Sequence, residues 1–225
     1  MSDQDWQALW LSLRLATTTT ALLLLLGTPL AWWLARTRHR LAFVVEAVIA
    51  LPLVLPPTVL GFYLLLALNP DGWIGRGVSA LGGPSMVFSF PGLVLASLFY
   101  SLPFVVQPIQ NAFMAMGERP MEVAATLGAS PLDRFFTVAL PLARNGLLSA
   151  TVLGFAHTLG EFGVVLMIGG NIPGQTQVAS IAIYEHVEAL DYSQAHWLSA
   201  TLLLISLLLL LPVYRQRRHG GGRLA

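Results

Sequence analysis

The sequence contains neither cysteine nor lysine, and only 10% of its 225 residues are charged. Without cysteine the chain has no disulfides and no thiolate metal sites. Without lysine it has no Walker A motif, so we expect it to bind no ATP of its own. We also expect no bound cofactor or metal. The formal net charge of +1 gives no case for a nucleic-acid partner. Any energy that drives this protein must come from another chain or from an ion gradient.

Hydrophobic residues make up 56% of the sequence, far more than a soluble core of this length requires. Most of them fall in long runs, and about 20 such residues cross a hydrocarbon layer of roughly 30 Å as a helix. We therefore expect one all-α integral membrane domain, residues 1–225, with about five transmembrane helices. The expected spans are residues 15–35, 41–68, 91–114, 146–168 and 197–214.

The positions of the arginines predict the orientation of these spans. Ten of the twelve arginines lie in segments that the positive-inside rule assigns to the cytoplasm: the turn at residues 36–40, the region around residues 117–142, and the tail after residue 214. Residues 69–90, rich in glycine, proline and serine, then form an outer loop. The N-terminus is expected outside and the C-terminus inside. The tail arginines are Arg215, Arg217, Arg218 and Arg223.

Residues 117–142 interrupt the apolar runs and have the pattern of two short helices joined by a glycine. Pro120 suits a first helical turn, and Gly128 is placed as a left-handed cap at the end of the first helix. Ser130 is a natural N-cap for the second helix, with Asp133 three residues later as in a capping box. Such a pair forms a projecting plug for the groove of another protein.

This segment resembles the "EAA…G…LP" cytoplasmic loop of the permease subunits of bacterial ABC importers, although Val123 stands where the family usually has alanine. The resemblance implies that the loop docks on a cytoplasmic ABC ATPase subunit, which would hydrolyse the ATP. The alternative is an amphipathic loop with no docking role. The residues expected to make the docking loop are Glu122, Ala124, Ala125, Gly128, Leu140 and Pro141.

The second expected span is interrupted by the sequence LPLVLPPT, which contains Pro52, Pro56 and Pro57. Each proline removes a backbone donor and kinks or unwinds a helix, which is tolerated in a membrane only against protein or water. One interpretation is a simple proline kink. The other is a broken segment that lines a transport pathway.

Polar side chains of the third expected span share one side of the helix. At 100° per residue, Ser97, Ser101, Gln107 and Asn111 fall within an arc of about 120°. We expect this face to avoid lipid, with Ser101 and Gln107 as pathway candidates.

The fourth expected span carries His157, Thr158 and Glu161, which share an arc of about 100° with Gly154. Glu161 is the one carboxylate well inside an expected span, so it should face protein or water. It either makes a structural hydrogen bond or acts as a gate that repels an anion. His157 and Glu161, four residues apart, also raise two rival hypotheses: an intramembrane metal-dependent hydrolase and a proton-coupled secondary transporter.

Three further motifs narrow the resemblance: LPLVLPPT, GEFG at residues 160–163, and NIPG at 171–174 followed by Gln175 and Thr176. Together they are similar to the molybdate-type ABC transporter permeases, with sulfate, thiosulfate and tungstate permeases as close alternatives. The resemblance implies a multi-pass protein of the bacterial inner membrane. It also implies two kinds of partner, ATPase subunits inside and an oxyanion-binding protein in the periplasm or outside the cell.

No arginine lies deep in any expected span, so tight binding of a dianion within the membrane is not expected. A separate binding protein would supply the affinity, and the membrane part would open and close a weakly interacting path. Because one polar face per chain cannot enclose a hydrated anion, we expect a homodimer with the pathway on its two-fold axis.

Overall fold

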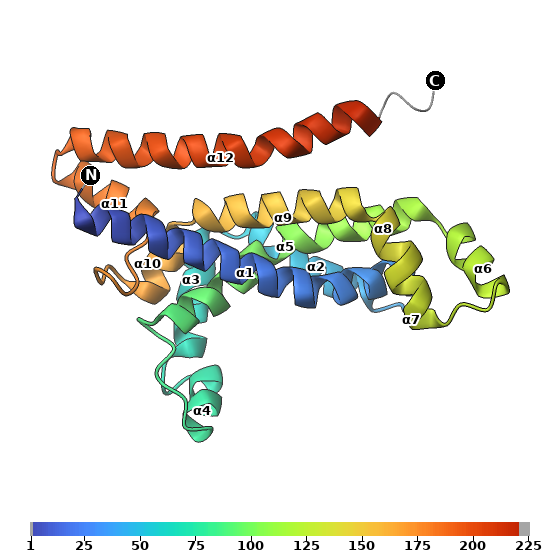
Figure 1. Ribbon diagram of the computed structural model, residues 1–225. Helices are drawn as coiled ribbons and strands as arrows, with labels where there is room; N and C mark the ends of the chain where they lie inside the picture. Colours follow the sequence, from blue (N-terminus) through green and yellow to red (C-terminus); the bar gives the residue numbers. More distant parts are fainter. Residues whose placement is uncertain (1, 221–225) are drawn as a thin grey trace.

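A computed structural model describes residues 2–220 of the chain, and side chains for residues 2–211. All the regular structure in this part is helical (Figure 1). The helices are α1 (Asp3–Arg36), α2 (Ala42–Val54), α3 (Pro57–Leu68), α4 (Trp73–Ala80), α5 (Phe90–Met116), α6 (Arg119–Thr126), α7 (Pro131–Arg134), the π-helical turn η1 (Phe135–Ala139), α8 (Leu140–Leu142), α9 (Arg144–Leu159), α10 (Gly163–Gly169), α11 (Ala179–Glu188) and α12 (Tyr192–Gly220).

Among the described residues, three helices are long and apolar enough to cross a membrane: α1, α5 and residues 192–211 of α12. Two bent pairs raise the number to as many as five. The first pair joins Ala42–Val54 to Pro57–Ala80 with a bend of 116°, and the second joins Pro131–Leu142 to Arg144–Leu159 with a bend of 70°. An all-α fold with three to five apolar spans is therefore confirmed.

The centre of the molecule is a bundle of α1, α5 and α9, which pack against one another. Packing between membrane helices depends on close van der Waals contact, and small residues allow that contact. Gly154 on α9 lies so close to α5 that a Cβ atom there would be 2.5 Å from Cγ2 of Val105. Val105 and Ile109 of α5 and Ala150 of α9 are fully buried. This bundle is the buried centre around which the shorter helices are arranged.

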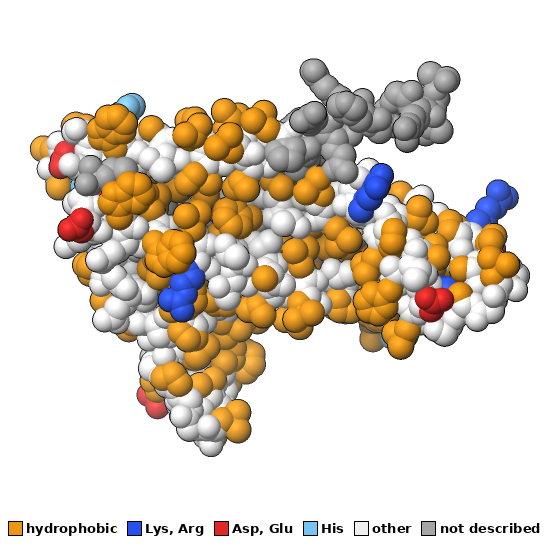
Figure 2. All heavy atoms as spheres, viewed as in Figure 1, with side chains coloured by type: hydrophobic (Ala, Val, Ile, Leu, Met, Phe, Trp, Pro, Cys, Tyr) orange, Lys and Arg blue, Asp and Glu red, His pale blue; other side chains and the backbone are white. Residues whose placement is uncertain are grey.

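The shorter helices lie around the bundle and at its two ends. The N-terminus and α11 lie at one end, and α6 and α7 lie at the other (Figure 1). Helix α4 projects sideways, and α12 runs along one side of the body, with only 11% of its most apolar stretch buried (Figure 1). On the face in Figure 2, most of the coloured side chains over the body are apolar, basic side chains lie at two places among them, and the acidic ones lie at the ends or on the projection. This distribution is the one expected of a chain surrounded by lipid.

Three sequence predictions need correction or qualification. The expected span at residues 146–168 is not one helix, because α9 ends at Leu159 and α10 begins at Gly163. The outer loop at residues 69–90 contains α4. The side chains of Arg215, Arg217 and Arg218, and all of Arg223, lie outside the described residues.

Candidate functional site

The two breaks in the expected spans meet at one cavity of about 590 Å³, which we call the break cavity. It brings together three of the predicted pathway residues, Pro57, His157 and Glu161. The breaks are in contact, because a Cβ atom on Gly163 would lie 2.8 Å from Cβ of Pro57. The full lining is Pro57, Thr58, Tyr100, Ala156, His157, Gly160, Glu161, Phe162 and Gly163.

The proline motif produces a true break. Helix α2 continues through Pro52 and ends at Val54, Pro56 is the N-cap of α3, and Pro57 opens α3, where its missing N–H costs nothing. The interpretation as a simple kink is therefore wrong. That these three prolines line a pathway stays a prediction.

A second group of predicted residues forms a hydrogen-bonded chain between α5 and α9. Ser101 Oγ lies 3.1 Å from Nδ1 of His157 and 2.9 Å from Oγ1 of Thr158. Thr158 gives its hydroxyl hydrogen to the Gly154 carbonyl at 2.9 Å. Ser101 then donates to Thr158, and Nδ1–H of His157 donates to Ser101, which leaves Nε2 as an acceptor. The imidazole ring stacks on Phe104 with 3.7 Å between ring centroids. This network fixes the orientation of His157 at the edge of the break cavity.

Glu161 lies in the break between α9 and α10, outside both helices. Its Oε1 accepts a hydrogen bond from the Val164 N–H at 2.9 Å, and its backbone carbonyl accepts one from the Ser180 hydroxyl. A carboxylate at this position stabilises the start of α10 through the hydrogen bond and the helix dipole. The prediction that Glu161 shares a helix face with His157 is wrong, because α9 ends two residues before it. The two metal ligands on one helix face that the hydrolase hypothesis requires are therefore not present at His157 and Glu161.

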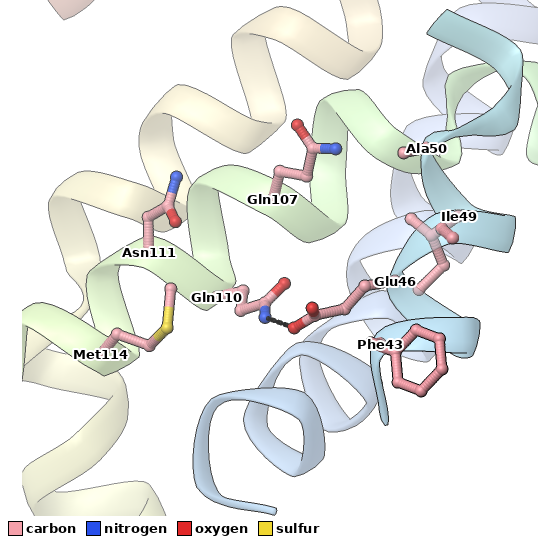
Figure 3. A pocket seen from close by; sticks show the side chains of 9 residues that line it. Phe43, Glu46, Ile49, Ala50, Gln107, Gln110, Asn111 and Met114 are labelled. Carbon is pink, nitrogen blue, oxygen red and sulfur yellow. Dashed lines mark hydrogen bonds between the residues drawn. The ribbon is translucent and has the colours of Figure 1, made fainter. Parts of the chain in front are cut away.

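Gln107, the remaining pathway candidate, lies in a different cavity. The polar residues of α5 do not all meet, because Ser101 and Gln107 lie at opposite edges of their arc of about 120°. Ser97 and Ser101 are buried in the protein, whereas Gln107 and Asn111 face a second cavity of about 590 Å³ between α2 and α5 (Figure 3). We call this the amide cavity. Its lining is Phe43, Glu46, Ala47, Ile49, Ala50, Gln107, Gln110, Asn111 and Met114.

Two polar residues of the amide cavity, Glu46 and Gln110, are not among the residues predicted from the sequence. Nε2 of Gln110 donates to Oε1 of Glu46 at 2.6 Å, which joins α5 to α2 (Figure 3). One signal was available in the sequence: Glu46 is the only polar residue between positions 42 and 54. Gln110 gave no such signal, because it lies outside the polar arc of α5.

Within residues 117–142 the caps expected at Gly128 and Ser130 are present, whereas the expected second helix is divided into α7, the π-helical turn η1 and α8. Helix α6 ends before Gly128, whose φ is +86°, and the Ser130 hydroxyl accepts the hydrogen bond of the Asp133 N–H. Buried Met121 and the ring of Phe135, packed 5.2 Å from Trp32, hold the segment against the ends of α1 and α5.

The far side of this segment is a projecting apolar surface. The large exposed side chains there are Val123, Leu127, Leu132 and Phe136. Among the predicted docking residues, Glu122, Ala125, Gly128 and Pro141 are exposed, and Ala124 and Leu140 are half-buried. The surface is available to a partner, and its docking role stays a prediction.

The known proteins that are similar in sequence to this chain are components of transport systems. Residues 27–223 match the family described as binding-protein-dependent transport system inner membrane component. The molybdenum transport system permease protein ModB of Azotobacter vinelandii is 60% identical over 222 residues, which cover 99% of this chain and 98% of that protein. ModB of Escherichia coli strain K12 is 35% identical over 99% of both chains. The probable sulfate transport system permease protein cysT of Zygnema circumcarinatum is 37% identical and covers 84% of this chain and 65% of that protein.

Solved structures share the fold. A bacterial ABC transporter involved in the import of alginate matches with a TM-score of 0.78 at 16% identity, over 97% of this chain and 80% of that chain. The MetNI methionine ABC transporter in an inward facing conformation matches with a TM-score of 0.73 at 17% identity, over 97% and 99%. The resemblance inferred from the loop and the break motifs is confirmed, and the chain belongs to the family of inner membrane components of binding-protein-dependent transport systems.

Proposed function

We propose that this chain is the membrane-spanning permease subunit of an ATP-driven oxyanion importer, and that the oxyanion is molybdate. The observation that carries the proposal is the 60% identity with a molybdenum transport permease along almost the whole chain. A sulfate transport permease is less similar, at 37% over a shorter stretch, so sulfate is the second candidate. Thiosulfate and tungstate are tetrahedral anions like molybdate and sulfate, and they are further candidates.

ATP is bound and hydrolysed by a partner protein. The exposed apolar surface at residues 117–142 is the docking loop for a cytoplasmic ABC ATPase, and a separate oxyanion-binding protein delivers the substrate from outside. Two copies of this chain enclose the pathway on a two-fold axis, with one copy of each cavity on either side. Polar side chains line each cavity within apolar spans, and in a membrane such side chains must face protein or water. This requirement supports a pathway enclosed by two copies of the chain.

Uptake of radiolabelled molybdate by cells that lack their own molybdate permease tests the function. Cells that express this chain with its ATPase and binding protein should accumulate labelled molybdate as long as they make ATP. Unlabelled tungstate should compete with this uptake more strongly than unlabelled sulfate does. Stronger competition by sulfate than by tungstate would make the sulfate system the better assignment. Uptake that continues without the ATPase would contradict the proposal.

The two rival classes make different predictions for the purified protein. A permease of this kind should copurify with its ATPase, whereas a proton-coupled transporter or a hydrolase should not. Molybdate uptake that follows an imposed proton gradient without ATP would favour the proton-coupled transporter.

A further inference from the structure

The amide cavity lies near the end of the molecule that carries α6 and α7. Glu46 is in the second turn of α2, just after the arginine turn at residues 36–40, and Gln110 is two turns before the end of α5. Helix α5 continues directly into residues 117–142, the proposed ATPase-docking loop. In the proposed topology the cavity is therefore at the inner mouth of the pathway.

The side chains around the cavity can recognise an anion. Gln107, Gln110 and Asn111 each carry an amide NH₂ group with two donors, and all three line the same space (Figure 3). The volume of about 590 Å³ is roughly twenty times the share of one water in liquid, which leaves room for a partly hydrated tetrahedral ion. Neutral amides bind such an ion weakly, as a pathway requires.

One of these donors is already occupied. Gln110 is buried, with 8% of its surface exposed, and its amide nitrogen donates to the exposed carboxylate of Glu46 at 2.6 Å. An ionised carboxylate only accepts hydrogen bonds, and so does a fully deprotonated oxyanion. The two therefore compete for the same N–H group, and their negative charges repel each other.

We infer that the amide cavity is a transit site for a tetrahedral oxyanion at the inner mouth of the pathway, and that the Glu46 carboxylate takes the place of the anion on Gln110 when the site is closed. The inference rests on the proposed function and names the substrate site within it. In the closed state one N–H of Gln110 is occupied by Glu46 and a negative charge stands at the site. Separation of α2 from α5 removes the charge and frees the donor, so one movement opens the site and makes it attractive.

Helix α2 is suited to such a movement. Ile49 is the only one of its thirteen residues that is buried within a single copy of the chain, so little packing inside the subunit holds the helix in place. The break after Val54 separates it from α3, which packs against α10. Glu161, in contrast, is 5% exposed and its carboxylate supports the backbone of α10, so releasing it would disturb the start of that helix.

The test uses the complete transporter, with ATPase and binding protein, reconstituted in vesicles loaded with radiolabelled molybdate. Without ATP, Glu46→Ala should raise molybdate leak about tenfold or more, the order expected for the loss of one charge-assisted hydrogen bond. Adding Gln110→Ala should lower that leak again, because the freed donor is removed. The exchange Glu46→Gln with Gln110→Glu should restore a low leak, because it rebuilds the hydrogen bond with the charge on the other helix. Val48→Ala, on an exposed part of α2 outside the cavity, is the matched control and should leak no more than the unmodified protein.

Three outcomes overturn the inference: an unchanged leak in Glu46→Ala, an equal rise in the leak of labelled glucose, or a leak that Gln110→Ala does not lower. The more conservative Glu46→Gln variant, which keeps a hydrogen-bonding side chain, should leak to an intermediate extent and covers the case in which Glu46→Ala assembles poorly. Loss of ATP-dependent molybdate uptake by the unmodified complex would instead contradict the proposed function, so the two failures can be told apart.

Discussion

Gly128 has a φ of +86°, and a Cβ atom placed there would meet nothing within 4 Å. The cost of a side chain at this position is therefore backbone strain alone, on the order of 1 kcal/mol or more. We predict that Gly128→Val leaves membrane insertion intact but abolishes transport and substrate-stimulated ATP hydrolysis, because it changes the angle between α6 and α7. Glu122→Lys, on the exposed surface of α6, should have the same effect.

Gly82 provides a matched control for Gly128. Its φ is +74° and the space around it is also open, but it follows α4, far along the chain from the docking loop. Gly82→Val should cost similar stability and keep stimulated ATP hydrolysis. Equal loss of hydrolysis in both variants would mean that strain, and not the geometry of the docking loop, causes the defect.

Glu161 allows a prediction that separates structure from gating. Because its carboxylate accepts the Val164 N–H in the first turn of α10, Glu161→Ala should destabilise the protein by about 0.5–2 kcal/mol, and Glu161→Gln, which keeps an acceptor oxygen, by less. Melting temperature and yield in detergent measure the effect, with ordinary coupling in the protein that survives. Normal stability with raised basal ATP hydrolysis in Glu161→Gln would instead support the gate.

At the scale of elements, the two broken spans are packed against each other at Gly163 and Pro57. Alanine normally stabilises a helix relative to glycine, but a Cβ atom on Gly163 would lie 2.8 Å from Cβ of Pro57, so one break must move. We predict that Gly163→Ala lowers thermal stability and transport. Gly77→Ala, in α4 with open space around it, should be neutral or slightly stabilising. Thermal unfolding and uptake of both variants check the pair.

The sequence predicts one of these breaks and not the other, for a physical reason. The break at Pro56 and Pro57 follows from local chemistry, since proline removes donors wherever it stands. The break at residues 160–162 depends on distant contacts, because Glu161 is held by Ser180 of α11 and Gly163 fits against α3. Local patterns therefore recover caps and proline breaks, as at Gly128 and Ser130. They miss pairings between helices, such as Glu46 with Gln110, which depend on how the elements pack.

At the scale of the whole molecule, the positions of the arginines predict the orientation of the chain in the membrane. The arginine turn at residues 36–40 and the docking loop should be cytoplasmic, and α4 should be outside. Reporter fusions at residues 80 and 129 should give an external and a cytoplasmic signal, respectively. Reversal of either signal would contradict the five-span arrangement, and with it the position of the amide cavity at the inner mouth.

The arrangement of polar and apolar surfaces also predicts how two copies meet. The amide cavity and the break cavity both involve the α2–α3 segment, so this side of the molecule cannot face lipid without exposing polar groups to it. Helix α12 packs on α9 and α11 and exposes leucines between residues 203 and 211, which lipid can cover. The second copy should therefore cover the side that carries α2 and α3, and α12 should stay at the edge of the dimer.

The absence of cysteine makes this arrangement directly testable, since a single introduced cysteine has no competing partner in the chain. Val54, at the end of α2, is 83% exposed, and Leu208, on α12, is 56% exposed. In membranes, a short bifunctional maleimide should join two copies of Val54→Cys into a dimer on a denaturing gel and leave Leu208→Cys monomeric. Both variants should react fully with a small monofunctional maleimide, so that a difference in cross-linking reports distance and not access. Cross-linking at Leu208 but not at Val54 would place the two-fold axis on the other side of the molecule, and the two cavities would then no longer lie along an enclosed pathway.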